Sequence, residues 1–382
     1  MQPFCRSTAL ALSLALVSLL VAPACAQQQV ESLATEVGPV AVQNLTDGLN
    51  HPWGMAFLPD GRLLVTERSG DLRILDTDGT LSAPVEGTPT VYAQRQGGLL
   101  DVALDPDFGE NGYVYLSYAK PGPSGQAATA LGRGRWEDDR IAGFEDLFVQ
   151  EPWYRSGLHF GSRIAFSPDG YLFVTTGDRG QREPAQDLSE HLGKVLRLNR
   201  DGSVPEDNPF VGRADARDEI WSYGHRNIQG AAVHPETGAI WTGEFGPLGG
   251  DEINQPKPGE NYGWPLVSWG MHYDGRSIPD PPTRPDLADA VAYWVPAISP
   301  SGMTFYTGDL FPEWTGNIFL GGLSSQSLIR VALDGETVGH EERIPIGARI
   351  RDVETAPDGS LYLLVDSGNG NVWRLAPLES DG

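Results

Sequence analysis

The most regular feature of the chain is a repeated pattern of apolar and polar positions. An apolar segment leads into a turn that holds proline with aspartate, glutamate or glycine, and a second segment rich in valine, leucine and aromatic residues follows. This pattern is typical of a β-hairpin, because such apolar residues favour strands and the turn residues interrupt them. Five copies are clear, namely Phe57 to Thr66, Leu104 to Tyr118, Phe166 to Thr175, Val233 to Thr242 and Thr355 to Val365.

The spacing of these copies predicts a sixth. The turn prolines stand at positions 59, 106, 168, 235 and 357, so the intervals are 47, 62, 67 and 122 residues, and the last is about twice the others. Met303 to Gly321 fills the gap, with two short apolar segments joined by a longer loop. Six copies at this period, in a chain without long helical patterns, predict an all-β fold, a six-bladed β-propeller. The apolar segment Val40 to Leu45 is expected to close the ring by completing the last blade.

Surplus length lies between the copies, in segments rich in glycine, proline, aspartate and asparagine. In a propeller, long connections build the face around the central channel, where ligands bind. We therefore expect long loops to form the active-site face, although any one of them alone would suit a tolerated surface loop. The three longest segments are Ala119 to Trp153, Gln181 to Arg217 and Pro247 to Pro296.

The first 26 residues have the pattern of a signal peptide. Arg6 supplies a positive start, Ala9 to Ala22 forms a run of small and apolar residues, and Ala24-Cys25-Ala26 resembles a cleavage site. The run is shorter than the roughly 20 residues that a spanning helix needs, so no integral membrane span is expected. Cleavage would leave residues 27–382 as one exported domain, periplasmic or secreted. Lipidation at Cys25 is an alternative, but Ala22 stands where a leucine is usual.

Composition and missing motifs exclude several function classes. The formal net charge of −24 makes nucleic acid an unfavourable partner. The chain has no Gly-x-Ser-x-Gly elbow, no His-Glu-x-x-His and no phosphate loop with Gly-Lys-Ser/Thr, which disfavours nucleotide cofactors. Both cysteines, Cys5 and Cys25, lie in the leader, so a cysteine metal site is excluded as well.

Several polar residues stand where a propeller chain enters the first strand of a blade. His159 precedes the third repeat and is the candidate general base, because an imidazole accepts a proton near neutral pH. Arg226 and Asn227 hold the equivalent position before the fourth repeat. A lone histidine in a loop is more often structural, but this coincidence favours a shared site at the channel.

Further cations and an amide occur at the same kind of position. Gln96 precedes the second repeat, and Arg349 and Arg351 precede the last, where their spacing puts both on one face of a strand. Arginines that converge in so acidic a chain predict an anionic ligand with several carboxylates or phosphates. The alternative is that they pair with neighbours such as Asp352.

The segment from Glu244 to Glu252 is dense in glycine and leaves backbone carbonyls free to turn outward. Carbonyls with nearby carboxylates suit calcium, although a tight loop with an acidic tip fits equally well. Further along the same insertion, Trp269, His272 and Tyr273 would either cover a flat ligand or form a small core of the loop.

Six motifs together resemble the glucose/sorbosone dehydrogenase family, over about Leu45 to Leu375. Each motif is weak alone, but their joint occurrence in this order is specific. The resemblance implies a soluble quinoprotein that uses pyrroloquinoline quinone (PQQ) and calcium on a six-bladed propeller. The motifs are Gln96-Gly97-Gly98-Leu99, His159-Phe160-Gly161, Gly224-His225-Arg226-Asn227, Glu244-Phe245-Gly246-Pro247 with Gly250-Asp251-Glu252, Asn261-Tyr262-Gly263-Trp264, and Arg349-Ile350-Arg351-Asp352.

The resemblance also implies a reaction and a role for each matching residue. An aldose sugar is oxidised to its lactone: His159 takes the proton of the anomeric hydroxyl, hydride passes to the quinone, and an external acceptor removes the electrons. Arg226 stabilises the negative charge that develops on the cofactor. By the same resemblance, Gln96, Asn227, Arg349 and Arg351 bind the cofactor, the carbonyls of Gly246 and Pro247 hold a calcium ion, and Glu252 with Tyr262 forms a second calcium site.

The chain departs from the family pattern at three places. Ser324 stands where members often place a lysine for the cofactor, which puts cofactor affinity in question. Leu158 replaces the aspartate that precedes the histidine in the glucose-specific branch, and Val295-Pro296-Ala297 lacks that branch's large aromatic residue, so Tyr273 is the remaining candidate to cover the quinone. Two other functions stay open, a calcium-dependent propeller lactonase or other hydrolase and a propeller that only binds. The oligomer is expected to be a monomer or homodimer.

Overall fold

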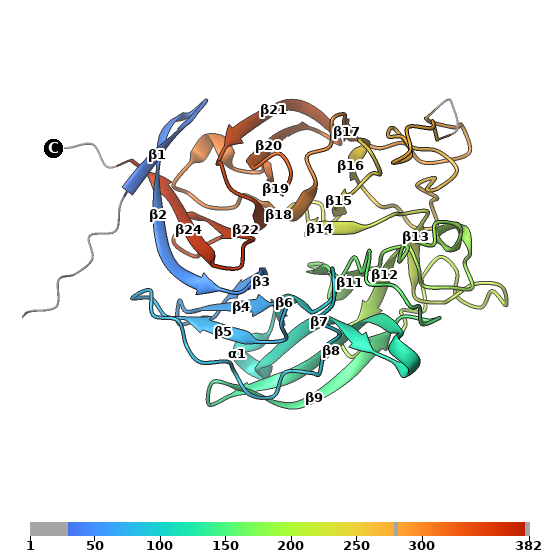
Figure 1. The fold of residues 1–382 in the computed structure, drawn as a ribbon, viewed down its shortest axis with the longest axis horizontal. Coiled ribbons are helices and arrows are strands. Elements are labelled where there is room, and N and C mark those ends of the chain that lie inside the picture. Colours follow the sequence, from blue (N-terminus) through green and yellow to red (C-terminus); the bar gives the residue numbers. More distant parts are fainter. Residues whose placement is uncertain (1–29, 279–281, 379–382) are drawn as a thin grey trace, which may run out of the picture.

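The hairpins expected from the sequence form the inner half of six β-sheets in the computed structural model, which describes residues 30–278 and 282–378. The sheets are arranged as blades around a common axis (Figure 1), so the prediction of a six-bladed, all-β propeller is confirmed. The signal peptide and lipidation at Cys25 stay predictions, because residues 1–26 lie outside the described residues. No helix in the described part of the chain is long and apolar enough to cross a membrane.

The first three blades follow one another along the chain, and all their strand pairs are antiparallel. A four-residue helix, α1 (Phe108–Asn111), lies in the turn between the first two strands of blade 2. Blade 1 contains β3 (Pro52–Phe57), β4 (Leu63–Glu67) and β5 (Leu72–Leu75); blade 2 contains β6 (Leu99–Leu104), β7 (Tyr113–Pro121), β8 (Ala127–Glu137) and β9 (Arg140–Val149); blade 3 contains β10 (Ile164–Phe166), β11 (Tyr171–Thr175), β12 (Lys194–Asn199) and β13 (Ile220–Tyr223).

The last three blades complete the circle. The hidden repeat is confirmed, because Met303 to Gly321 contains parts of the first two strands of blade 5. Blade 4 contains β14 (Ile228–Val233), β15 (Ile240–Glu244), β16 (Asp251–Asn254) and β17 (Ala292–Trp294); blade 5 contains β18 (Pro300–Phe305), β19 (Ile318–Gly322), β20 (Ser327–Asp334) and β21 (Thr337–Pro345); blade 6 contains β22 (Ile350–Thr355), β23 (Leu361–Val365), β24 (Gly370–Pro377), β2 (Gly38–Leu49) and β1 (Val30–Thr35).

The ring is closed by the two ends of the chain. The N-terminal strand β2 pairs with the C-terminal strand β24, with Val42 opposite Leu375, and Figure 1 shows the blue strand beside the red one. The expected closure by Val40 to Leu45 is therefore confirmed. The chain then passes from β2 directly into β3 of blade 1, so the hydrogen bonds between β2 and β24 close the ring.

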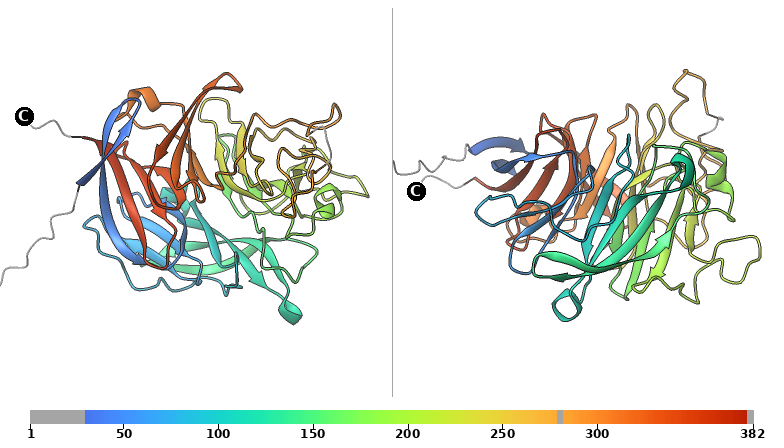
Figure 2. Two further views of the ribbon diagram at one scale, coloured as in Figure 1. Left: turned by 45° about the horizontal axis from the view of Figure 1, so that its top comes forward. Right: turned by 60° about the horizontal axis from the view of Figure 1, so that its bottom comes forward.

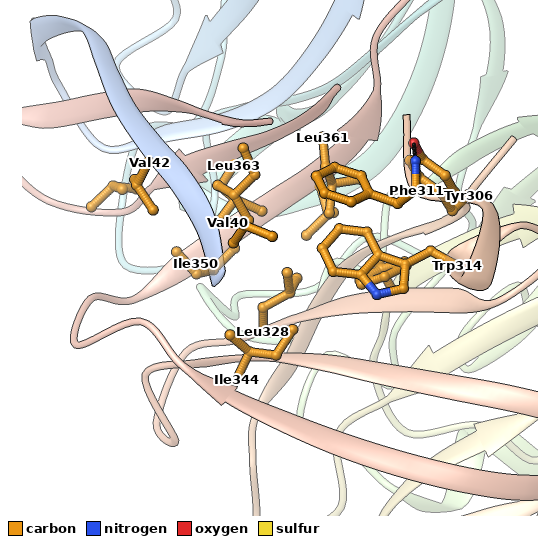
Figure 3. Packing of buried hydrophobic residues seen from close by; sticks show 14 residues of the cluster. Val40, Val42, Tyr306, Phe311, Trp314, Leu328, Ile344, Ile350, Leu361 and Leu363 are labelled. Atoms are coloured by element: carbon orange, nitrogen blue, oxygen red, sulfur yellow. Dashed lines mark hydrogen bonds between the residues drawn. The ribbon is translucent and has the colours of Figure 1, made fainter. Parts of the chain in front are cut away.

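Each blade packs face to face on its neighbours. The second strands β4, β15 and β19 are buried at every position, because a blade in the ring has a neighbour on both faces. One apolar cluster fills the space between blades 5 and 6 (Figure 3). Its centre is Trp314, which is completely buried and contacts the rings of Phe311 and Phe319.

The expectation about long connections needs a correction. Ala119 to Trp153 is mostly strand, since it contains the end of β7 and all of β8 and β9. The sequence pattern marked only the inner hairpins, and the outer strands were counted as loops because β8 is rich in small residues and β9 is largely exposed. The segment between β16 and β17 is a long loop in the described residues, and Figure 2 shows it extending from one side of the ring.

Candidate active site

A cavity of about 390 Å³ lies at the mouth of the central channel. Gln96, Asn227, Arg349 and Arg351, four residues singled out from the sequence, line this one cavity although they come from three different blades. They converge because each stands at or next to the start of a blade's first strand, and the first strands surround the channel. His51, Trp53, Arg68, Gln229, Phe245, Ser299, Leu323 and Asp366 complete the lining.

Arg349 and Arg351 share an acidic partner in the cavity wall. Their Nη2 atoms lie 3.2 Å and 2.7 Å from Oδ2 of Asp366, and His51 Nδ1 lies 3.1 Å from its Oδ1. Burial alone would raise the pKa of Asp366, but the charges of the two arginines and the contact with His51 hold this pKa well below its usual value. The alternative pairing with Asp352 is not found, because that carboxylate pairs with Arg163 at 3.0 Å.

Two of the arginines that line the cavity also carry donors that no acceptor among the described residues satisfies. In the part of the chain that the structure describes, no acceptor reaches the buried Nε atoms of Arg68 and Arg351. Three guanidinium groups and one carboxylate leave the lining with a net positive charge. Unsatisfied buried N–H groups in a positive cavity fit a ligand with several carboxylates, as PQQ has.

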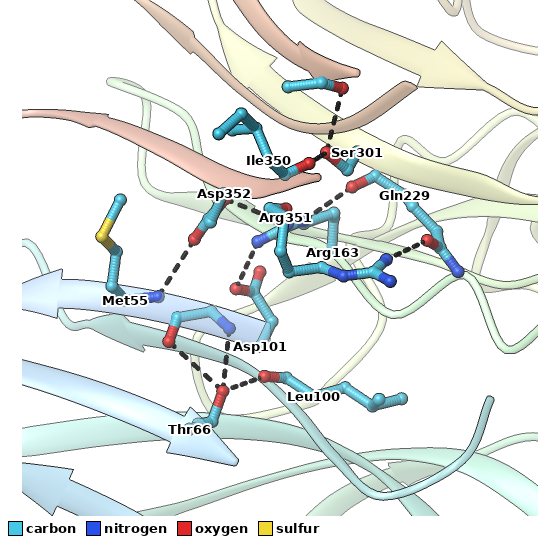
Figure 4. Close-up of polar contacts among 12 residues, drawn as sticks. Met55, Thr66, Leu100, Asp101, Arg163, Gln229, Ser301, Ile350, Arg351 and Asp352 are labelled. Carbon is cyan, nitrogen blue, oxygen red and sulfur yellow. Dashed lines mark hydrogen bonds and ion pairs between the residues drawn. The ribbon is translucent and has the colours of Figure 1, made fainter. Parts of the chain in front are cut away.

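A buried polar layer closes the channel below the cavity (Figure 4). Arg163 donates to Asp101 Oδ1 at 2.9 Å and to the carbonyl of Gln229 at 2.7 Å, and its guanidinium stacks on the ring of Trp53 at 4.2 Å. Arg351 donates to the side-chain oxygen of Gln229 at 2.8 Å. These bonds connect four blades and fix the floor on which a ligand would lie.

His159 lies next to the cavity with its ring held by Asp178. His159 Nδ1 is 2.6 Å from Asp178 Oδ1, the carboxylate is almost completely buried, and the imidazole is 12% exposed. Trp264 Nε1 donates to the other carboxylate oxygen at 2.8 Å, and the Gly180 amide donates to Oδ1 at 2.7 Å. Burial would raise the pKa of Asp178, but its bond to His159 and the charge of Arg226 lower it, so the carboxylate stays ionised and leaves His159 Nε2 as the free nitrogen.

The backbone around His159 is held in an unusual conformation. His159 has a φ of 49°, and its N–H donates to Oε1 of Gln96 at 2.7 Å. The adjacent strand end must carry glycine, because a Cβ on Gly177 would lie 2.1 Å from the carbonyl oxygen of His159. Buried Arg179 donates to the carbonyls of Leu158 at 2.9 Å and of Ser156. These contacts fix the position of the imidazole.

Arg226 lies beside the glycine-rich loop after β15. Its Nη1 donates to the carbonyls of Gly246 at 2.7 Å and Phe245 at 3.2 Å, and its Nη2 lies 3.4 Å from the hydroxyl of Tyr273. The carbonyl of Gly246, one of the two expected calcium ligands, is therefore also the acceptor for Arg226. Tyr273 is 71% exposed, so its ring lies at the outer edge of the site.

A second group of oxygen donors lies behind this loop. Burial raises the pKa of Glu252 to about 8, and the negative charge of Glu244 adds to the effect. Asn254 donates to Glu252 at 3.1 Å, while its own Oδ1 is buried and has no donor among the described residues. The Tyr262 hydroxyl donates to Gln255 at 2.6 Å, which leaves the Tyr262 carbonyl as its available oxygen. Carboxylate, amide and carbonyl oxygens are the donors that calcium prefers.

Ser324, which stands in place of the family lysine, lies at the rim of the cavity. Its hydroxyl accepts a hydrogen bond from Ser299 at 2.8 Å and donates to the carbonyl of Ala297 at 3.2 Å. Ser299 lines the cavity, so position 324 borders it on the blade 5 side.

Among the ionisable residues that line the cavity or contact His159, the sequence analysis did not predict His51, Arg68, Asp178 and Asp366. The repeat itself could have identified them. His51 directly precedes the first strand of blade 1, whereas Arg68, Asp178 and Asp366 follow the second strands of blades 1, 3 and 6. Residues just before the first strand of a blade and residues just after its second strand lie at the same mouth of the central channel. The sequence interpretation considered mainly the positions just before the first strands.

The sequence matches the model of the family described as "Glucose / Sorbosone dehydrogenase" over residues 49–374. It is 46% identical over 345 residues to "Aldose sugar dehydrogenase YliI" of Escherichia coli (strain K12), covering 88% of this chain and 93% of that protein.

Two solved structures are similar over most of their length. The apo-form of the soluble aldose sugar dehydrogenase from Escherichia coli has a TM-score of 0.86 and 44% identity, covering 89% of this chain and 100% of that one. The PQQ-bound aldose sugar dehydrogenase from Streptomyces coelicolor has a TM-score of 0.73 and 27% identity, covering 91% and 99%.

Proposed function

The chain belongs to the glucose/sorbosone dehydrogenase family, and on this premise we propose that it oxidises aldose sugars to lactones with PQQ and calcium. The observation that carries the proposal is the pairing of His159 with buried Asp178 beside a cavity lined by arginines. A base and an anion-binding cavity are the two elements that such an oxidation requires from the protein.

The base acts on the anomeric hydroxyl of the sugar. Oxidation of this carbon to a lactone breaks its C–H bond and the O–H bond, so a hydride and a proton must leave. The cofactor, when bound, supplies the acceptor for the hydride. His159 takes the proton on Nε2, and Asp178 stabilises the imidazolium that results, because its carboxylate contacts Nδ1. Asp178 is therefore a positioning residue in this proposal. It takes the place of the orienting aspartate that the glucose-specific branch has at the position of Leu158.

Other residues bind and orient the cofactor. Arg349 and Arg351 would pair with its carboxylates, and Gln96 and Asn227 would offer side-chain amides. Arg226 would place its positive charge beside the ligand, where it stabilises developing negative charge. Tyr273 at the outer edge would cover one side of the site, and Ser324 contributes a hydroxyl at the rim.

Calcium has two candidate positions. The carbonyls of Gly246 and Pro247 would hold the ion next to the cofactor, in competition with the Arg226 guanidinium at Gly246. The buried carboxyl of Glu252, with the free amide oxygen of Asn254 and the carbonyl of Tyr262, would hold a second, structural ion. A bound cation there would neutralise Glu252, whose charged form burial otherwise disfavours.

The proposal also includes the compartment, the electron acceptor and the oligomeric state of the protein. Export to the periplasm or the medium, an external electron acceptor and a monomer or homodimer fit this function, and the export rests on the leader described above.

Dye-linked oxidation of several aldoses by the purified apoprotein tests the proposal. The assay is run with PQQ and calcium together, with each alone and with neither. We expect turnover only with both, and release of a lactone. No turnover, together with no change in absorbance when PQQ is titrated into the protein, would overturn the proposal and favour the hydrolase or binding-only functions.

A further inference from the structure

Arg68 stands at the mouth of the channel although no motif marks it. It directly follows β4 and lines the cavity that holds Arg349 and Arg351. Its Nη1 donates to the carbonyl of Arg95 at 2.9 Å, which fixes the guanidinium beside the Gln96 turn. The turn lies close against the Arg68 backbone, because a Cβ on Gly98 would meet the carbonyl oxygen of Arg68 at 2.1 Å.

The guanidinium of Arg68 lacks the partners that its neighbours have. In the same blade, Arg62 pairs with Asp60 and Asp139, and Arg73 contacts Glu67. Among the described residues, no carboxylate pairs with Arg68, and its buried Nε has no acceptor. A buried N–H without a partner is costly, and Arg68 lines the cavity, so a ligand in this cavity is the acceptor that we expect for the guanidinium.

Arg68 contributes more uncompensated positive charge to the cavity than either Arg349 or Arg351 does. Arg349 and Arg351 share Asp366, so together these three groups carry one net positive charge. The charge of Arg68 is not offset in this way. Burial lowers the pKa of Arg351, and the positive charge of Arg68 contributes to this shift, which agrees with two guanidinium groups close to one cavity.

We propose that Arg68 binds a carboxylate of PQQ and supplies the positive charge that the family pattern places at position 324. Ser324 borders the cavity from blade 5, and Arg68 lines it from blade 1, so the two positions flank the same space. The inference rests on the proposed function, and it removes the objection that Ser324 weakens cofactor binding.

The test is a titration of apoprotein with PQQ in calcium buffer, followed by absorbance and by calorimetry. Arg68→Met should raise the Kd about 10-fold to 100-fold, the loss expected for a hydrogen bond between charged groups. Arg62→Met is the matched control, because it removes a charge from the same blade away from the cavity, and its Kd should stay that of the wild type. The thermal midpoint of the Arg68→Met apoprotein should change little, since Arg68 has no carboxylate partner among the described residues and its hydrogen bond to the Arg95 carbonyl is exposed.

A second pair of variants separates charge from shape. Arg68→Lys should lose less affinity than Arg68→Met, and Ser324→Lys added to Arg68→Met should recover most of the loss. Arg68→Met with the Kd of the wild type overturns the inference while the proposed function stands. Arg68→Lys and the double variant that both bind as weakly as Arg68→Met overturn the role of charge. A wild type that does not bind PQQ overturns the proposed function itself.

Discussion

Replacing Asp178 by asparagine tests the proposed mechanism at the pair that carries it. The carboxylate accepts three hydrogen bonds, from His159 at 2.6 Å and Gly180 at 2.7 Å on Oδ1 and from Trp264 at 2.8 Å on Oδ2. Asparagine has nearly the same shape but only one acceptor oxygen and an NH₂ group. At least one of the three donors must therefore face another donor.

The magnitude follows from these contacts. If the amide oxygen stays on the His159 side, the bond to the imidazolium weakens from the charge-assisted range to the neutral one, by about 1–2 kcal/mol. This corresponds to a fall in kcat of about 5-fold to 30-fold. If the NH₂ group turns toward His159 instead, the wrong tautomer is favoured, and the loss reaches about 10⁴-fold, as in serine proteases. Asp178→Asn should thus lose at least about fivefold in kcat.

The assay is dye-linked aldose oxidation at saturating PQQ and calcium, with the Kd for PQQ measured separately. We expect kcat to fall while the Kd for PQQ stays within about threefold of the wild-type value, because Asp178 does not line the cofactor cavity. Asp187→Asn, in the loop that follows, is the matched control and should keep wild-type turnover. A kcat of Asp178→Asn within a factor of about two of the wild type would refute the role of the pair.

Three further predictions concern the general base His159, the carboxylate of Asp366 that pairs with two arginines, and the apolar core around Trp314. His159→Ala should bind PQQ nearly as the wild type does but abolish turnover, and wild-type-like activity would remove His159 from the mechanism. Asp366→Asn should lower the free energy of unfolding at pH 7 by about 3–5 kcal/mol. The folded pKa of Asp366 lies below the unfolded value of about 3.9, so this contribution to stability is present above that pH and is lost as pH falls through the folded pKa. In urea unfolding, the difference in stability between wild type and variant should therefore be smaller at pH 3 than at pH 7. Equal differences at the two pH values would contradict the assignment. Trp314→Ala should cost about 3–5 kcal/mol in the same assay, whereas Leu310→Ala at the surface should cost less than about 1 kcal/mol.

The sequence by itself determined the fold and part of the site. The hairpin pattern recurs because each blade needs two apolar strands at its centre, and strands buried on both faces are continuously apolar, as in Leu63 to Val65. Gln96, Asn227, Arg349 and Arg351 were identified because they precede such strands, and local spacing is sufficient to place them at one end of the ring.

The tertiary structure decided which side chains become partners. His159 meets Asp178 across 19 positions of sequence, and Arg351 pairs with Asp366 rather than with adjacent Asp352, whose side chain points to the other face of the strand and meets Arg163. The outer strand β9 escaped the sequence interpretation, because an exposed strand lacks the continuous apolar pattern. In the sequence, Ser324 leaves out the positive charge of the family lysine. The cavity nevertheless contains Arg68, from a blade more than 200 residues away in the chain. A ring brings together residues by their place in the repeat, so the charge balance of the cavity depends on residues from several blades and cannot be read from any one of them.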